Sequence, residues 1–426
     1  MLTRFYRGFQ TGLVARFVLP MVFQKSRSEM ALSGDLLAKF PVSPLNGRER
    51  IWFHAASVGE LESLWTVILA WASRHEEVIV TVLSESASDH LRRMREALAV
   101  TRCKACFVGY APWEGEWLEA LRKLKPSLFV TAKYEAWPDL WMSLAETRVP
   151  LVVVGAKWRR SLDVAKRACR WMNSGLPSLS FLTVMDAEQE DLKKEFPDAT
   201  IIATGEPRWD RVQERVQRGS PEARSLIERM EAAPRPWGIL GSIWESDLSV
   251  WQESISKMPG TLWLVPHQVD PIHLSKVENW LSGQGIRYLK SSSLARFERT
   301  SARQCILVDE MGFLSELYAV ADWAYVGGGF GAGVHSTIEP AIHGIPIACG
   351  TKSAWKFAEI DQLSSAGQLT LVPEKRDLVL WSHRIASNGV AVSERTRWKE
   401  LCQGRMNATR RVTSELEKLA RPWGGC

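Results

Sequence analysis

Short apolar segments rich in β-branched residues alternate with helical patterns along most of this 426-residue chain, and this alternation restricts the possible fold more than any other feature. Helical patterns at 60–73 and 87–97 separate the first three strand-like segments. The first half of the chain has five such segments, at 51–55, 78–83, 127–131, 151–154 and 181–185. Uninterrupted apolar runs of this length are typical of parallel strands that helices cover on both faces. The pattern therefore predicts β-α-β units and a doubly wound α/β sheet.

A second series of the same kind follows a charged connection. Residues 211–229 are helix-competent and end in Ala-Ala-Pro-Arg-Pro, a composition typical of a linker between two cores. Strand-like segments then recur at 237–240, 261–265, 286–289, 305–308, 323–326 and 345–348. Ligands bind outside the carboxyl ends of the strands in such sheets. Two tandem Rossmann-like domains therefore predict a ligand-binding cleft between them.

The expected domain organisation follows from this division. We expect Rossmann-like domains at 49–215 and 230–400, a separate N-terminal segment at 1–48 and a C-terminal helix at 401–426. The charged, helical pattern of 394–419 leaves open whether the end of the chain returns to the first domain.

The N-terminal segment is predicted to lie on a membrane surface. Its longest apolar run is about ten residues and is interrupted by Arg16 and Pro20, whereas a spanning helix needs about twenty. Aromatic and leucine side chains alternate there with arginines, which suits a helix in the headgroup region of an anionic leaflet. The alternative is an N-terminal helix packed on the protein.

Composition narrows the class of protein and of partner. The net charge of +6 and the pI near 8.9 favour acidic partners such as nucleotides, phosphorylated lipids or an anionic membrane. No basic run is interleaved with aromatics, so we expect no nucleic-acid partner. Seven cysteines without regular spacing indicate a reducing compartment and no disulfide framework. We found no DxD motif after a strand, no metal-spaced His and Cys cluster and no GxSxG, which predicts chemistry without a metal or a serine nucleophile.

The clearest motif is glycine-rich and runs from Trp323 to Gly350. A strand-like segment leads into five glycines that include Gly328 and Gly329, and a helix is expected to open near Ser336. Glycines let backbone N–H groups approach an anion, and a helix N-terminus supplies further donors. We therefore predict a phosphate-binding loop. Its spacing fits neither the dinucleotide fingerprint nor the P-loop.

Ser336 and Glu339 allow two interpretations. Their spacing fits a capping box, which would make Glu339 purely structural. The functional alternative is that Glu339 accepts the hydroxyl groups of a ribose one turn from the phosphate.

Three further segments place polar residues directly after strands. Ser57 and Gly59 are expected to form a tight turn that leads to Glu60 at a helix start, where a carboxylate can act as a general base. The helix dipole would keep the pKa of Glu60 low. Glu135 and Asp139 lie four residues apart on the turn where another strand meets a Pro-started helix, and His267 follows a further strand. Each segment also has a structural interpretation. Glu60 would then only stabilise the start of a helix, Glu135 would belong to a solvated helix start, and His267 would be a structural histidine.

In this order the segments resemble the Kdo transferase family, which moves 3-deoxy-D-manno-octulosonic acid (Kdo) from CMP-Kdo onto lipid A precursors. FHAASVGE resembles the family's HAxSVGE, YEAWPDL resembles TExWPNL, GSIWESD matches GSTxxGEE, and HSTIEPAIHGIPIACG resembles HNxLEPAxxGxPVxxG. The resemblance covers about residues 51–363. Four residues depart from the family pattern, namely Lys133, Ile243, Ser336 and Lys356, and Lys133 stands where the family usually has a second acid.

The resemblance implies a GT-B glycosyltransferase that is peripheral on the cytoplasmic face of the inner membrane and needs no cofactor or metal. It implies inverting transfer with Glu60 as the catalytic base and with Ser57, Gly59 and Glu135 near the acceptor. The donor-binding residues it implies are Ser242, His267, Met311, Gly312, Gly328, Gly329, His335, Ser336 and Glu339. The alternatives are a GT-B transferase that uses another nucleotide sugar, a sugar-nucleotide epimerase, and a non-catalytic lipid-binding protein.

Overall fold

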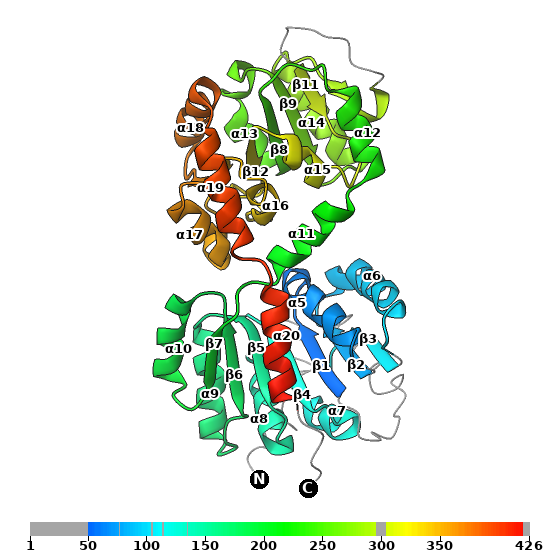
Figure 1. Cartoon of the computed structure of the whole chain (residues 1–426), viewed down its shortest axis with the longest axis vertical. Helices are drawn as coiled ribbons and strands as arrows, with labels where there is room; N and C mark the ends of the chain where they lie inside the picture. The colour runs from blue at the N-terminus through cyan, green and yellow to red at the C-terminus, as the bar shows by residue number, and fades with distance from the viewer. Residues whose placement is uncertain are drawn as a thin grey trace. The chain divides into compact units, whose positions relative to one another are not determined.

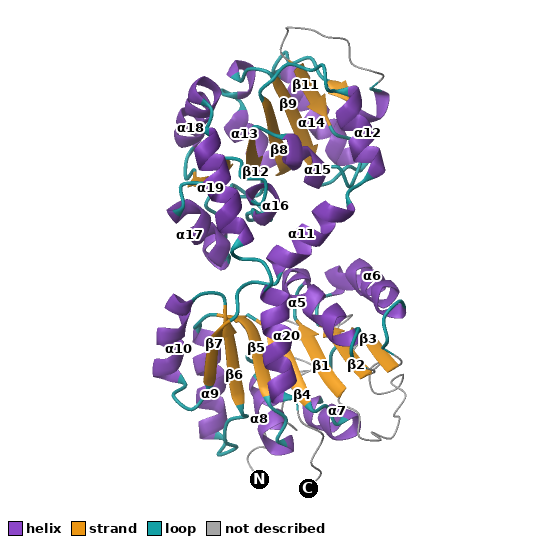
Figure 2. Cartoon of the chain, viewed as in Figure 1, coloured by secondary structure: helices purple, strands orange, loops and turns teal. Residues whose placement is uncertain are grey.

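The computed structural model describes residues 50–75, 77–103, 105–112, 115–133, 135–294 and 304–420. The chain forms two compact units, unit 1 with Met1–Arg211 and Met406–Cys426, and unit 2 with Val212–Arg405 (Figure 1). The predicted bounds of 49–215 and 230–400 stay a prediction, and the N-terminal membrane segment expected at 1–48 lies outside the described residues. Each unit contains a seven-stranded parallel sheet with helices around it (Figure 2), so the predicted α/β fold class is confirmed.

Unit 1 has the strand order β3-β2-β1-β4-β5-β6-β7. The strands are β1 Arg50–Ala55, β2 Glu77–Val82, β3 Ala105–Tyr110, β4 Leu128–Ala132, β5 Leu151–Ala156, β6 Leu179–Thr183 and β7 Thr200–Ala203. The helices are α5 Val58–Ala72, α6 Ser88–Ala99, α7 Trp117–Leu124, α8 Pro138–Thr147, α9 Arg160–Trp171, α10 Gln189–Glu195 and α20 Ala408–Leu419. Short 3-10 helices lie at Glu85–Ala87 and Asp186–Glu188.

The sheet of unit 1 is buried on both faces, which explains its uninterrupted apolar strands. Ile51 and Phe53 of β1 belong to a core with α5, α6 and α20, whereas Trp52 belongs to a second core with α7, α8 and α9. The register aligns Ile51 with Val78 of β2 on one side and with Leu128 of β4 on the other. Continuous burial of this kind favours parallel over antiparallel strands.

The end of the chain belongs to unit 1. Helix α20 packs against α5, as its red ribbon shows in Figure 1. Thr409 and Thr66 share a hydrogen bond of 2.6 Å, and the Asp210 carboxylate accepts the N–H groups of Asn407 and Thr409. The structure thus answers the question that the sequence left open. The helix expected over 394–419 is broken into two, because Asn407 takes a left-handed backbone conformation.

Unit 2 has the strand order β10-β11-β9-β8-β12-β13-β14. The strands are β8 Trp237–Ile243, β9 Thr261–Pro266, β10 Leu289–Lys290, β11 Gln304–Leu307, β12 Trp323–Val326, β13 Ile347–Cys349 and β14 Leu369–Leu371. The helices are α11 Arg208–Arg218, which begins in unit 1, α12 Pro221–Arg229, α13 Glu245–Trp251, α14 Pro271–Gly283, α15 Leu314–Val320, α16 Ile338–Ala341, α17 Ala358–Ser365, α18 Lys375–Asn388 and α19 Val392–Gln403. Short 3-10 helices lie at Ile255–Lys257, Ser291–Ser293 and Ala354–Lys356.

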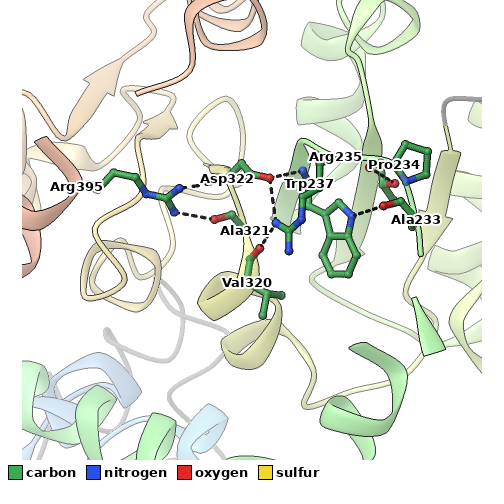
Figure 3. Close-up of polar contacts among 9 residues, drawn as sticks. Ala233, Pro234, Arg235, Trp237, Val320, Ala321, Asp322 and Arg395 are labelled. Carbon is green, nitrogen blue, oxygen red and sulfur yellow. Dashed lines mark hydrogen bonds and ion pairs between the residues drawn. The ribbon is translucent and has the colours of Figure 1, made fainter. Parts of the chain in front are cut away.

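A polar network fixes the amino ends of the two central strands of unit 2 (Figure 3). Asp322, directly before β12, accepts the N–H of Trp237 at the start of β8 (2.7 Å) and pairs with Arg235 (3.0 Å). Arg395 of α19 donates to the carbonyl of Ala321 (3.0 Å). Helix α19 is thereby tied to the edge of the sheet opposite the strand ends that carry the predicted site.

Within the described residues, no helix is both long enough and apolar enough to cross a bilayer.

Candidate active site

In unit 1 the carboxyl ends of β1 and β4 form the point where the strand order reverses. The chain runs outward from β1 through β2 to β3, and then outward on the other side from β4 through to β7. Loops that leave such a point in opposite directions frame a crevice in which doubly wound sheets bind ligands. Glu60 follows β1 and Glu135 follows β4, so the two predicted carboxylates lie at this position.

Glu60 is held in place by the first turn of α5. The Ser57 N–H donates to Glu60 Oε2 (3.0 Å), and the Glu60 N–H donates to Ser57 Oγ (3.4 Å), which completes a capping box. Gly59 lies inside α5 rather than in a tight turn, so that prediction was wrong. Among the described residues, no atom outside the chain neighbours and the backbone of the same helix lies within 4 Å of the place where a Cβ on Gly59 would stand. The loop thus orients one carboxylate and leaves open space in the same turn.

Burial controls the ionisation of both carboxyl groups, each 8% exposed. Desolvation raises the pKa of Glu60, although the nearby positive charge of Lys133 opposes this shift. The low pKa predicted from the helix dipole is therefore wrong, because loss of solvent outweighs the dipole. Desolvation and the charge of Glu60 raise the pKa of Glu135 to about 8, while its hydrogen bond from the Trp137 indole acts in the other direction. At neutral pH the pair thus carries a proton on Glu135.

The segment that begins with Glu135 is buried instead of being a solvated helix start. Asp139 is fully buried in the first turn of α8, where its carboxylate accepts the N–H of Gly115 (2.7 Å). Asp139 therefore has a structural role.

A second group of charges, which the sequence reasoning missed, lies beside Lys133. Glu206, three residues after the end of β7, is buried and pairs with Arg208 (3.3 Å). Burial opposes its ionisation, but the charges of Arg208 and Lys133 outweigh burial and lower the pKa of Glu206. A Cβ on Gly155 would lie at ordinary contact distance from Lys133 Cγ (3.7 Å) and Glu206 Oε2 (3.9 Å), so this position adjoins both side chains, and its φ of 66° favours glycine. In the sequence, the charged segment GEPRWD, which follows two isoleucines, could have indicated this group of charges.

In unit 2 the strand order reverses between β8 and β12, where the glycine motif begins. Asp247 of α13 links the two loops, because one carboxylate oxygen accepts the N–H of Gly328 (2.8 Å) and that of Trp244 (2.9 Å). The Tyr325 hydroxyl donates to the other oxygen (2.7 Å). Asp247 is fully buried, and desolvation raises its pKa. Sequence reasoning missed Asp247, although it lies at an acidic position of the GSTxxGEE pattern.

The glycines of this loop are required mainly for close packing of the backbone. A Cβ on Gly329 would stand 2.5 Å from the backbone of Gly350, and one on Gly327 would stand 2.4 Å from the carbonyl of Ser242. The N–H groups of Gly327, Gly328, Gly331 and Gly333 all donate to acceptors inside the protein. These four N–H groups are therefore already hydrogen-bonded within the protein, and a phosphate would have to be bound by other donors of the loop.

The helix predicted to open at Ser336 is a single turn. Helix α16 begins at Ile338 with Thr337 at its N-cap and has no side-chain cap, so the capping box of Ser336 and Glu339 is not formed. Glu339 pairs instead with Arg215 of α11 (3.0 Å). The carboxylate of Glu339 therefore binds the guanidinium of Arg215, which is distant in the sequence, and does not cap the helix.

Two histidines and a tryptophan form a stack after β8, β9 and β12. The His267 and His335 rings lie 4.3 Å apart at 18°, and the Trp244 ring stacks on His267 at 4.6 Å. The Trp244 indole N–H donates to His335 Nε2 (2.8 Å), which leaves the ring proton of His335 on Nδ1. Burial and the neighbouring His267 lower the pKa of His335 to about 4, and burial lowers that of His267. Both rings are neutral at physiological pH, and Trp244 was not predicted.

The remaining predicted donor residues lie at the same edge of the sheet. Ser242 takes a left-handed conformation at the end of β8, with φ of 53°. Met311 and Gly312 follow β11 and are exposed. Among the described residues, no group of three or more His, Cys, Asp or Glu side chains is arranged to hold a metal ion.

Residues 26–211 match the family model for 3-deoxy-D-manno-octulosonic-acid transferase (kdotransferase). In sequence the chain is similar to the Kdo transferases. The 3-deoxy-D-manno-octulosonic acid transferase of Bordetella pertussis is 24% identical over 388 residues, which cover 86% of each chain. A bifunctional glycosyltransferase/methyltransferase of Fusobacterium nucleatum is 25% identical over 340 residues, which cover 75% of this chain and 50% of that protein. The predicted resemblance is confirmed, and the chain spans about half the length of the bifunctional relative.

A solved structure shows the same fold. UDP-GlcNAc 2-epimerase from Neisseria meningitidis, bound to UDP-GlcNAc, superposes with a TM-score of 0.55 over 87% of this chain and 100% of that chain, at 12% identity. At this identity the likeness is one of fold alone.

The family model and the full-length relative match different parts of this chain. The family model ends at residue 211, so it contains Glu60, Lys133, Glu135 and Glu206 but none of the glycine loop. The Bordetella pertussis relative aligns over 86% of the chain and so extends into unit 2.

Replacing Glu135 with Gln should change how stability depends on pH. Between about pH 4.5 and pH 8 the folded chain keeps a proton on Glu135 that the unfolded chain has released. The free energy of unfolding therefore decreases as pH rises through this range. Glutamine cannot titrate, and the fall in melting temperature between about pH 6 and pH 8 should therefore be smaller in Glu135→Gln. Thermal melts at both values test this. Glu119→Gln, at an exposed position of α7, is the control and should melt like the parent.

Proposed function

We propose that the chain is an inverting glycosyltransferase that moves Kdo, or a related ulosonic acid, from CMP-Kdo to a lipid A precursor. The main support is the buried pair of carboxyl groups, Glu60 and Glu135, at the strand-order reversal of unit 1. The pair lies within the segment that matches the Kdo transferase model. The Bordetella pertussis relative named above is a 3-deoxy-D-manno-octulosonic acid transferase by name.

In the proposed reaction Glu60 is the general base. Glu60 takes the proton of an acceptor hydroxyl group, whose oxygen forms a bond to the anomeric carbon of the ulosonic acid. The bond from that carbon to the phosphate oxygen breaks, and CMP leaves with the electron pair. In this proposal Glu135 holds the proton and Glu60 is the ionised partner. Burial raises the pKa of Glu60, and the positive charge of Lys133 opposes that rise. Ser57 would keep the carboxylate oriented, and the open space at Gly59 would admit the acceptor.

Unit 2 would bind the donor and stabilise the leaving phosphate. The proposed contacts are Ser242, His267, Met311, Gly312, Gly328, Gly329, His335, Ser336 and Glu339. The neutral His335 has its proton on Nδ1 and can donate it to a phosphate oxygen, which supports this part of the proposal. Negative charge that develops on the phosphate would be stabilised without a metal ion, and we propose that none is needed.

A direct assay tests the function. The full chain is incubated with CMP-Kdo formed in place and a lipid A precursor, and the lipid is analysed by mass spectrometry. We expect the mass of one or more Kdo residues to be added, and EDTA supplied after the CMP-Kdo has formed should not slow transfer. Transfer only from a UDP-sugar would identify a different GT-B enzyme. Lipid binding without any product would identify a non-catalytic relative.

We also propose that the protein is peripheral on the cytoplasmic face of the inner membrane. The amphipathic composition of residues 5–25 and the lipid nature of the proposed acceptor support this location.

A further inference from the structure

Exposed apolar side chains of unit 1 are concentrated around helix α9. Five large apolar side chains described in this unit are well exposed, and four of them lie between residues 158 and 176, with Val100 as the fifth. Trp171 is 74% exposed, Val164 51% and Trp158 38%. Tryptophan is usually buried over most of its area, so two exposed indoles next to one helix indicate a contact surface.

The exposed residues share one face of α9. Arg160, Val164, Arg167 and Trp171 follow one another at spacings of four, three and four residues, which places them in a single stripe along the helix. The opposite face packs into the core of unit 1 through Leu162, Ala165 and Cys169. The exposed stripe is therefore a separate surface and does not belong to the hydrophobic core. We define the α9 surface as Trp158, Arg160, Val164, Arg167, Arg170 and Trp171.

The charge of the α9 surface is positive. It contains three exposed arginines, and Asp163 is the only acid in the helix. Asp163 pairs with Arg167 (2.8 Å) and lies 3.5 Å from the buried Lys166, whose ammonium group also binds Glu195. Asp163 and Glu195 thus balance Lys166 and Arg167, and Arg160 and Arg170 leave a net positive charge at opposite ends of a helix about 18 Å long.

We propose that the α9 surface docks on the headgroup region of an anionic lipid bilayer. Indole rings favour the boundary between headgroups and acyl chains, and arginines interleaved with them favour anionic lipid phosphates. A second copy of the chain fits less well, because a two-fold interface would set the three arginines of each copy against those of the other. The proposed membrane contact is separate from the N-terminal segment and does not depend on catalysis.

Binding of the full chain to vesicles of equal parts phosphatidylglycerol and phosphatidylcholine tests the charges. Each arginine near an anionic surface contributes about fivefold to affinity, so R160Q/R167Q/R170Q should bind about a hundredfold more weakly. The matched control R92Q/R93Q/R102Q removes three exposed arginines elsewhere in unit 1 and should retain most of the binding. Equal binding by the two triple variants would overturn the proposal. Melting temperatures show whether each variant is folded.

A local probe separates α9 from the N-terminal segment, which is present in every variant. Trp171→Cys and Val100→Cys are each labelled with an environment-sensitive fluorophore, and the label on the parent chain's own thiols is subtracted. Position 171 should shift to shorter wavelength with anionic vesicles and not with phosphatidylcholine alone, whereas position 100 should not respond. No shift at 171 would refute the proposal. So would a loss of self-association in Trp171→Ser with unchanged vesicle binding, because the surface would then be an interface between copies. Neither donor nor acceptor is present, so these results are independent of the transfer assay.

Discussion

Replacing Glu60 with Gln is expected to abolish Kdo transfer while the variant still folds and binds CMP. The amide cannot take a proton from the acceptor, and loss of a general base costs about 10²–10⁴-fold in rate. The glutamine carbonyl can still accept the Ser57 N–H that now bonds to Glu60 Oε2, so the cap of α5 should survive. The measurements are kcat in the transfer assay, CMP affinity by calorimetry and a thermal melt.

Glu62→Gln is the matched control for Glu60→Gln, because it removes a carboxylate from the same helix. Glu62 pairs with Arg211 at 3.5 Å and is partly exposed, so its loss should change kcat by less than about threefold. Near-normal turnover by Glu60→Gln would show that another group is the base. Loss of CMP affinity in Glu60→Gln would show instead that the substitution disturbs more than the proton transfer.

Gly329→Ala should weaken donor binding by more than about tenfold and lower the melting temperature by about 5 °C. The added methyl group would stand 2.5 Å from the Cα and N atoms of Gly350, which is too close for any rotation of a side chain to relieve. The loop after β12 must therefore separate from the segment after β13. This separation would move the neighbouring groups proposed to bind the phosphate. Calorimetry with CMP and thermal melts measure the two effects.

The control for Gly329→Ala is Gly283→Ala at the end of α14. In the part of the chain that the structure describes, no atom beyond the chain neighbours and the backbone of the same helix lies within 4 Å of a Cβ at Gly283. Alanine is also the better helix former, so stability should stay equal or rise slightly. An unchanged melting temperature and CMP affinity in Gly329→Ala would contradict the packing role of this glycine and its place in the donor site.

The strands that sequence reasoning missed or misplaced lie at the edges of the two sheets. β3 and β7 border the sheet of unit 1 and were not predicted, and β14 borders that of unit 2. The segment expected at 286–289 forms only the two-residue strand β10, at the other edge. Central strands are buried on both faces and carry a continuous apolar run, whereas an edge strand is partly exposed, so its pattern is weaker.

The sequence by itself determined the α/β class, the central strands and the positions of Glu60, Glu135 and the glycine loop. These features depend on local apolar runs and on residues next to strand ends, and both can be read along the chain. Only the tertiary structure decided the ionisation of the carboxyl pair, the approach of Lys133 to Glu206, the pairing of Glu339 with Arg215 and the return of α20 to unit 1. Each of these depends on burial or on charges contributed by segments far apart in the chain, and neither has a local signature.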